Sequence, residues 1–412
     1  MNFVKGFPKI ASIFLLGNGQ SFIGKEKDEQ EKRSDATLDE LGLDKKLKFL
    51  IRKEEEIPGI NINGVDGFVI FPYCSERFTP LIYLAETSLP TLIISEEETF
   101  CHALETYEYL STNKNVQIAF SPKEVKKWIR LLSTEKWCAK TKICLFDAGD
   151  WKLGGIAYLK NPIFSSKLNT QNIDKEKFLE AYRNMDEIKA KRLAKEWMDT
   201  AEKILEPTFE DIVKSARVYL AMKTVMNEMK ADVAYVLWCG QFTKDLGTKM
   251  CFALAKLTDD GIPVGCWRGE NLLPLLILYS VSEKPVFVCE AHTQKGKTIT
   301  LRHCFAPTTI TNRKYVLRRW RNMEGTVTGY CQLPTGEVTL VNCGVGDKLV
   351  IVKGKVTDCK DLEGDNCRMT IWVELEDAEV IRKFVGREFA MVYGDYVEEA
   401  REIGAKLGLK VL

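Results

Sequence analysis

The sequence contains only three histidines, and none of its 13 cysteines forms a CxxC pair. Without cysteines at that spacing, neither a zinc ribbon nor a thioredoxin-type redox centre is expected. The cysteines are odd in number, and several lie in apolar runs, among them Cys144, Cys239, Cys251 and Cys289. This pattern predicts free, buried thiols in a cytoplasmic protein.

The chain also carries little net charge. Its 59 basic and 58 acidic residues leave a formal net charge of +1, which argues against attraction to nucleic acid or to an anionic membrane surface. The apolar run at residues 272–281 is too short to cross a bilayer. We therefore expect neither a nucleic-acid partner nor a membrane partner.

A length of 412 residues exceeds one ordinary hydrophobic core, so two or three domains are expected. In residues 1–150, apolar strands alternate with helices, which predicts a Rossmann-like α/β domain with a doubly wound parallel sheet. A buried strand is expected at residues 142–148, at the end of this domain. Residues 39–56 are expected to form a charged helix, and the charged run 26–37 a surface loop.

Residues 151–283 predict a second α/β domain, with long helices at 175–205 and 208–230. Residues 284–412 contain short strands separated by turn dipeptides, which predicts an antiparallel β-barrel-like C-terminal domain. The alternating basic and apolar residues at 315–320 are typical of an edge strand protected by charge.

The stretch from residue 261 to residue 307 supplies two carboxylates and an imidazole from strand ends and loops. Glu270 lies in a loop, Glu290 ends a short buried strand, and His303 ends the next one. Two carboxylates and an imidazole are suitable ligands for a hard divalent cation. We therefore expect Glu270, Glu290 and His303 to bind Mn²⁺ or Mg²⁺.

Other readings of these residues stay open. A salt bridge between Arg268 and Glu290 also explains a buried charge. Asn18 lies in a Gly-Asn-Gly loop after the first strand, which is either an ordinary turn or a contact for sugar hydroxyls at the end of a parallel strand.

The motifs of residues 209–412 resemble the L-fucose isomerase-like family, a relative of L-arabinose isomerase. The resemblance rests on GIP…GE, PVF…E, HC…P, GDKLVIVKGKV and VYGDY followed by two acidic residues. It implies that Glu290 corresponds to an acidic metal ligand, and His303 resembles a metal-binding histidine of the arabinose isomerase branch. Two family ligands are replaced, one by Trp267 or Arg268 and the other by Glu388 or Phe389.

This resemblance implies a divergent metal-dependent isomerase that interconverts an aldose and a ketose, an intramolecular oxidoreductase. Glu270 and Glu290 would then be catalytic. The sugar would be bound by Arg268, Trp267, His303, Asn18 and Glu388. Because two ligands are replaced, a non-catalytic relative that binds a sugar or sugar acid is the alternative. The resemblance also implies a homo-oligomer, a trimer or a hexamer.

Overall fold

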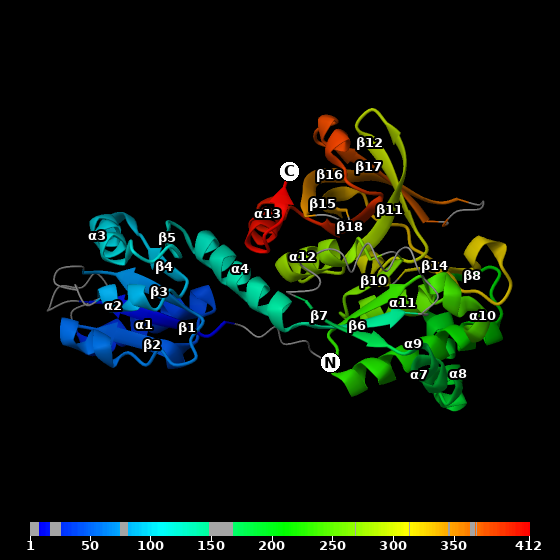
Figure 1. Cartoon of the computed structure of the whole chain (residues 1–412), viewed down its shortest axis with the longest axis horizontal. Coiled ribbons are helices and arrows are strands. Elements are labelled where there is room, and N and C mark those ends of the chain that lie inside the picture. The colour runs from blue at the N-terminus through cyan, green and yellow to red at the C-terminus, as the bar shows by residue number, and fades with distance from the viewer. Residues whose placement is uncertain are drawn as a thin grey trace. The chain divides into compact units, whose positions relative to one another are not determined.

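The computed structural model describes residues 8–16, 26–74, 81–147, 168–267, 269–312, 314–344, 347–362, 367 and 369–412. The chain divides into two compact units at the junction of Lys136 and Trp137. We call the part before the junction the N-terminal unit and the part after it the C-terminal unit, and describe each by itself (Figure 1).

A five-stranded sheet forms the centre of the N-terminal unit. All its strands are parallel, in the order β2-β1-β3-β4-β5. The strands are β1 (Ile10–Leu15), β2 (Lys48–Ile51), β3 (Gly67–Pro72), β4 (Thr91–Ile94) and β5 (Val116–Ala119). The parallel α/β sheet expected from the sequence is therefore confirmed.

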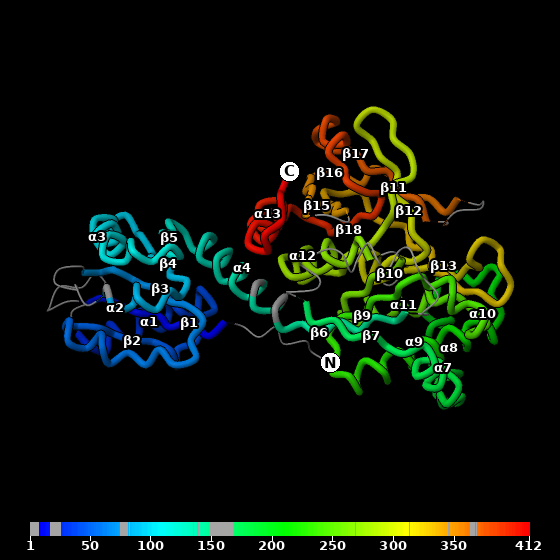
Figure 2. Tube along the Cα trace, viewed as in Figure 1, coloured from blue at the N-terminus to red at the C-terminus, as the bar shows by residue number. Residues whose placement is uncertain are grey.

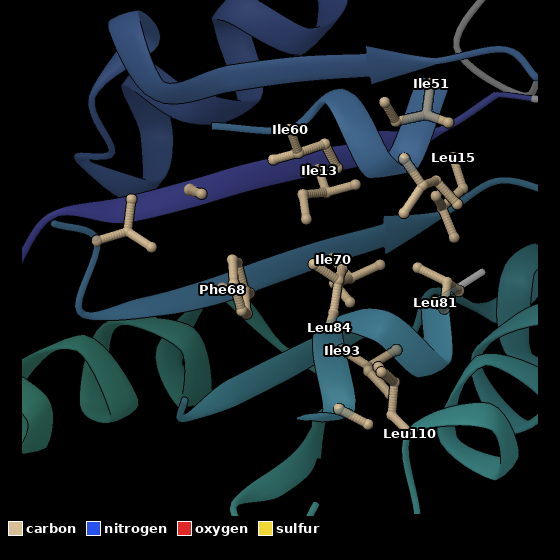
Figure 3. Close-up of a cluster of buried hydrophobic side chains, with 14 of the residues drawn as sticks. Ile13, Leu15, Ile51, Ile60, Phe68, Ile70, Leu81, Leu84, Ile93 and Leu110 are labelled. Atoms are coloured by element: carbon tan, nitrogen blue, oxygen red, sulfur yellow. The ribbon is translucent and has the colours of Figure 1, made fainter. Parts of the chain in front are cut away.

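Both faces of this sheet are apolar, because alternate side chains of each strand enter different cores. One core contains Ile13, Ile70 and Ile93 together with residues of α2 (Ile82–Glu86) and α3 (Phe100–Leu110) (Figure 3). The other core contains residues of α1 (Lys27–Leu41) and α4 (Pro122–Lys140). A parallel sheet covered on both faces follows from the continuous apolar strands of the sequence.

The structure corrects two expectations in the N-terminal unit. The charged run expected to be a loop forms most of α1, because Leu38 and Leu41 lie on one helix face and enter the core. The segment expected to be a charged helix contains β2, which pairs with β1. Both elements were mispredicted because their segments are highly charged, and an edge strand or a surface helix needs few apolar residues to pack against a core.

A second parallel sheet lies in the C-terminal unit, in the order β10-β9-β6-β7. Its strands are β6 (Lys142–Asp147), β7 (Asn169–Ile173), β9 (Val233–Leu237) and β10 (Val264–Trp267). The sequence predicts this strand at the end of the first domain, with a boundary near residue 150. In the structure β6 pairs with β7 and β9, so it belongs to the second sheet.

Helices connect and follow the strands of the second sheet. They are α7 (Lys175–Arg183), α8 (Glu187–Thr200), α9 (Phe209–Met229), α10 (Thr243–Leu246), α11 (Cys251–Asp259) and α12 (Leu272–Ser282). The single helix expected at 175–205 is two helices, because the Asp186 side chain accepts hydrogen bonds from the first amides of α8 and caps it.

Six antiparallel strands then close into a barrel, in the order β15-β18-β11-β12-β17-β16, with β16 returning to β15 (Figure 2). The strands are β11 (Phe287–Lys295), β12 (Thr298–His303), β15 (Gly336–Cys343), β16 (Lys348–Asp361), β17 (Met369–Leu375) and β18 (Glu388–Tyr393). The short β19 (Lys410–Val411) pairs with β16, and α13 (Val397–Lys406) and α12 contact the barrel. The expected C-terminal barrel is confirmed.

The basic run was expected to be an edge strand. Its strand β13 (Val316–Arg318) instead lies between β14 (Thr328–Tyr330) and β8 (Lys203–Ile204). Arg318 has a structural role there, because its guanidinium pairs with Glu206 at 2.6 Å and also with Asp361. Among the described residues, no helix is long and apolar enough to cross a membrane.

Candidate functional site

The C-terminal unit contains a cavity of about 350 Å³ beside the ends of β9 and β10 and the barrel strands β11 and β12. We call it the tryptophan pocket. Its walls include Trp238, Trp267, Trp320, Glu290, His303 and Arg387. The carboxyl ends of parallel strands are a common place for ligand binding in α/β sheets.

Trp238 and Trp267 form one aromatic wall of this pocket. Trp238 directly follows β9, and Trp267 is the last residue of β10. Their ring centroids are 4.1 Å apart. Trp267 has φ of 100° and Trp238 has φ of 53°, both unusual for residues with a side chain. A backbone amide of Trp238 donates to the Trp267 carbonyl at 3.0 Å, which holds the two strand ends together. Strained backbone of this kind often occurs at binding sites.

Two of the expected acidic residues are cross-strand neighbours. Glu290 on β11 lies directly opposite Glu388 on β18. Arg387 contacts both, with its Nη2 3.1 Å from Glu290 Oε2 and its Nε 3.7 Å from Glu388 Oε1. Phe389, the other residue proposed for this position, packs edge-on against Phe384. The Arg387 guanidinium therefore already provides a positive charge beside the carboxyl groups of Glu290 and Glu388.

Glu388 is the most deeply buried of these acids, with 1% exposure. Burial raises the pKa of its carboxyl well above the ordinary value, and the charges of Glu290 and Glu270 raise it further. Arg387 and a hydrogen bond from Asn271 act in the opposite direction but do not outweigh burial.

A buried polar network holds Glu388 in place. Asn271 Nδ2 donates to Glu388 Oε2 at 3.0 Å, and the Tyr235 hydroxyl donates to Asn271 Oδ1 at 2.6 Å. The same hydroxyl accepts a hydrogen bond from the Gly269 amide at 3.0 Å. Strand β9, the loop after β10 and strand β18 are thereby linked, which rigidifies the floor beneath the acids.

His303 has a different environment from the acids. Its imidazole is 3% exposed and packs edge-on against Phe305 at 4.7 Å and Phe287 at 6.3 Å between ring centroids. Burial lowers the pKa of the imidazole to about 4, although Cys239 and the backbone of Phe305 oppose this shift. His303 is therefore neutral at pH 7.

The strand register separates His303 from Glu290. Glu290 pairs with Arg302 across the β11–β12 ladder, and side chains of directly paired residues share a face. His303 is the next residue along β12, so it points to the other face. Both side chains reach the pocket wall, but from opposite faces of the ladder.

These residues do not fit a divalent metal ion. The Arg387 guanidinium contacts Glu290 and Glu388, the raised pKa of Glu388 favours its neutral form, and His303 lies on the other face. No group of three or more His, Cys, Asp or Glu in the described residues is arranged to hold a metal ion. The expected Mn²⁺ or Mg²⁺ site is therefore not formed by Glu270, Glu290 and His303 together.

Several polar atoms in the pocket wall are buried and have no hydrogen-bond partner within the described part of the chain. They are Trp267 Nε1, Gln241 Oε1, Arg302 Nε and His303 Nδ1. Buried polar atoms are rarely left unsatisfied, because each lost hydrogen bond costs about 1–3 kcal/mol. All four residues line the same cavity, and a wall with this many polar side chains is suited to a ligand with several hydroxyl or carboxylate groups.

Of the site residues expected from the sequence, Glu290, Trp267 and His303 line the pocket. Glu388 is the cross-strand neighbour of Glu290, and Glu270 directly precedes Asn271, which bonds to Glu388. Asn18 and Arg268 lie outside the described residues. Sequence reasoning missed Trp238, Arg302 and Arg387. An available signal was that Trp238 directly follows one strand of the parallel sheet and Trp267 ends the neighbouring one.

The Glu388 carboxyl gives the first prediction. Because the pKa of Glu388 is raised in the folded state, the folded protein binds this proton more tightly than the unfolded chain does. The resulting stabilisation is complete below the ordinary pKa of about 4.5 and is lost as the pH rises towards the folded value. The variant Glu388→Gln should therefore gain stability relative to wild type between pH 6 and pH 8.5. Urea unfolding at both pH values measures this. Parallel pH dependences of wild type and variant would contradict it, and Glu379→Gln, at an exposed position, is the control.

No model of a known protein family matches this sequence, and no curated protein matches it.

Proposed function

We propose that the tryptophan pocket binds a sugar or a sugar acid and that binding needs no divalent metal. The supporting observation is the set of polar side chains in the pocket wall, which includes Trp267, Gln241, Arg302 and His303. A polyhydroxylated ligand offers both donors and acceptors to this set. The adjacent indole rings of Trp238 and Trp267 provide an apolar wall for the C–H face of a sugar ring.

The charge of the pocket favours an acidic sugar over a neutral one. Arg302, Arg321, Arg387 and Lys249 line it, together with the single acid Glu290 among the described wall residues. Lys249 Nζ and Arg321 Cζ each lie 4.3 Å from the centre of the Trp320 ring, which positions both cations at the wall. Guanidinium groups bind carboxylates through paired hydrogen bonds.

The resemblance to L-fucose isomerase-like proteins remains part of this proposal. On that basis the chain is a divergent relative in which Arg387 supplies the positive charge that a metal ion supplies in the family, and it assembles as a trimer or hexamer. Size-exclusion chromatography with light scattering tests the assembly.

Ligand-induced stabilisation tests the binding proposal. Thermal unfolding is followed with a panel of pentoses, hexoses, deoxy sugars and sugar acids, each with EDTA and with Mn²⁺. We expect a sugar acid to raise the melting temperature equally under both conditions. Stabilisation that appears only with Mn²⁺, or no stabilisation by any compound of the panel, would overturn the proposal.

A matched pair of variants tests the role of Arg387. Arg387→Gln should weaken binding of the sugar acid about tenfold, because it removes one charged hydrogen-bond donor. Arg382→Gln, on the exposed turn η8 (Glu379–Lys383), should leave the affinity unchanged. Isothermal titration calorimetry measures both. Equal affinities of the two variants would show that Arg387 does not contact the ligand.

Glu290 supports a second candidate function, aldose–ketose isomerisation. It is a carboxylate in the pocket wall, and such a base can move a proton between adjacent sugar carbons through an enediol. In D₂O, an isomerase would incorporate deuterium at C2 of the aldose, which NMR detects, and Glu290→Gln would abolish the exchange. Binding without exchange in wild type would leave only the first candidate.

A further inference from the structure

Five cysteine side chains gather at the tryptophan pocket, although they are far apart in the sequence. They are Cys239, Cys251, Cys266, Cys304 and Cys367. Cys239, Cys251 and Cys266 are buried, whereas Cys304 and Cys367 are partly exposed. Cys304 and Cys367 are therefore the two cysteines of this wall that are only partly covered.

Cys304 and Cys367 are in direct contact, with their Sγ atoms 2.9 Å apart. Cys304 directly follows β12 and Cys367 closely precedes β17, and these strands are paired up to His303 and Met369. The ladder thus fixes the separation of the two backbone segments. Two sulfurs already this close need only a small shift to reach the S–S bond length of about 2.05 Å.

We propose that Cys304 and Cys367 are a redox pair that closes to an intramolecular disulfide at the expense of a low-molecular-weight disulfide. This modification is independent of what the pocket binds.

The exchange proceeds in two steps. The Cys304 thiolate attacks one sulfur of the small disulfide RSSR, which forms a mixed disulfide and releases RS⁻. The Cys367 thiolate then attacks the Cys304 sulfur, the protein disulfide forms, and the second RS⁻ leaves. Two protein sulfurs are oxidised, the small disulfide is reduced by two electrons, and both thiol protons end on the two RS⁻ groups.

Trp320 favours Cys304 as the attacking sulfur. Its indole Nε1–H donates to Cys304 Sγ at 3.2 Å, which stabilises negative charge there. Contact with Cys251 raises the pKa of the Cys304 thiol, and contact with Cys304 raises that of Cys367. Thiolate is therefore scarce at pH 7, and the exchange should accelerate about tenfold per pH unit as the pH rises to 8.

Peptide mapping of the full-length protein tests the pair. The protein is treated with bis(2-hydroxyethyl) disulfide at pH 8, its remaining thiols are alkylated, and the linked peptides are identified by mass spectrometry. We expect a linkage between residues 304 and 367 that dithiothreitol reverses. Any other cysteine pair, or mixed disulfides only, would overturn the proposal. Because wild type is mapped directly, the result does not depend on whether a variant folds.

Variants give a second readout. In a Cys101→Ser background, which removes an exposed thiol, the oxidised protein should melt roughly 5 °C or more above the reduced protein, because the bond closes a loop of 63 residues. Cys304→Ser should abolish this difference, whereas Cys343→Ser, at a buried cysteine outside the pocket wall, should retain it. A difference that persists in Cys304→Ser would assign the effect to another site.

Discussion

Acidification from pH 7 to pH 4 should destabilise the wild-type barrel by about 3 kcal/mol more than it destabilises a His303→Gln variant. The pKa of His303 is about 4 in the folded protein, because the imidazole is buried. In the unfolded chain the ordinary value of about 6.5 applies. Below pH 6.5 the unfolded state therefore binds a proton that the folded state does not, and stability falls with each further unit.

Hydrogen exchange measures this effect where it acts. Amides of β11 and β12 in the full-length protein should lose protection between pH 7 and pH 5 by about 2 kcal/mol more in wild type than in the variant, after correction for the intrinsic exchange rate. The substitution His102→Gln, on helix α3 of the N-terminal unit, is the control and should leave the barrel unaffected. Equal losses in wild type and His303→Gln would show that the imidazole is not buried in neutral form.

The substitution Gly265→Ala should destabilise the C-terminal unit by about 3 kcal/mol. A Cβ at this position in β10 would lie 2.3 Å and 2.5 Å from ring carbons of Tyr235. The ring cannot move away easily, since it is fully buried and its hydroxyl bonds to both Asn271 and Gly269. The added methyl group would therefore disturb the network that holds Glu388.

Gly240→Ala provides the matched control for this clash. A Cβ at position 240 would meet only the flexible end of Lys249, at 3.6 Å. Thermal unfolding should show a clear loss for Gly265→Ala and almost none for Gly240→Ala. If Gly265→Ala melts with wild type, the Tyr235 ring has more freedom than its hydrogen bonds indicate.

The sequence predicted strands better than it predicted their partners. Strand β3 reads GFVIFP and is buried throughout, so its place inside a parallel sheet followed from composition. Strand β6 also has a buried apolar centre, but its pairing with β9 is a contact between distant segments that its own residues do not reveal. Helix α1 was missed because its anchors Leu38 and Leu41 stand in a charged segment.

The sequence placed Glu290 and His303 at strand ends and singled out Trp267 before them. All three line one pocket, although β11 continues past Glu290 to Lys295. Whether two such side chains share a face depends on the pairing register of β11 and β12, and a register is a tertiary property. The contact of Arg387 with Glu290 depends on β18 lying beside β11, which no local pattern specifies.

The alternation of side chains along β12 restricts how a metal-dependent catalyst could arise from this scaffold. The side chain at position 303 leaves the face of the ladder opposite to that of position 290, because its direction is set by the register and not by the surrounding side chains. An imidazole introduced at position 302 would project beside Glu290, and removal of the guanidinium at 387 would remove the cation that contacts Glu290 and Glu388. A metal site on this scaffold would therefore require changes at Arg302 and Arg387, and His303 would not be one of its ligands.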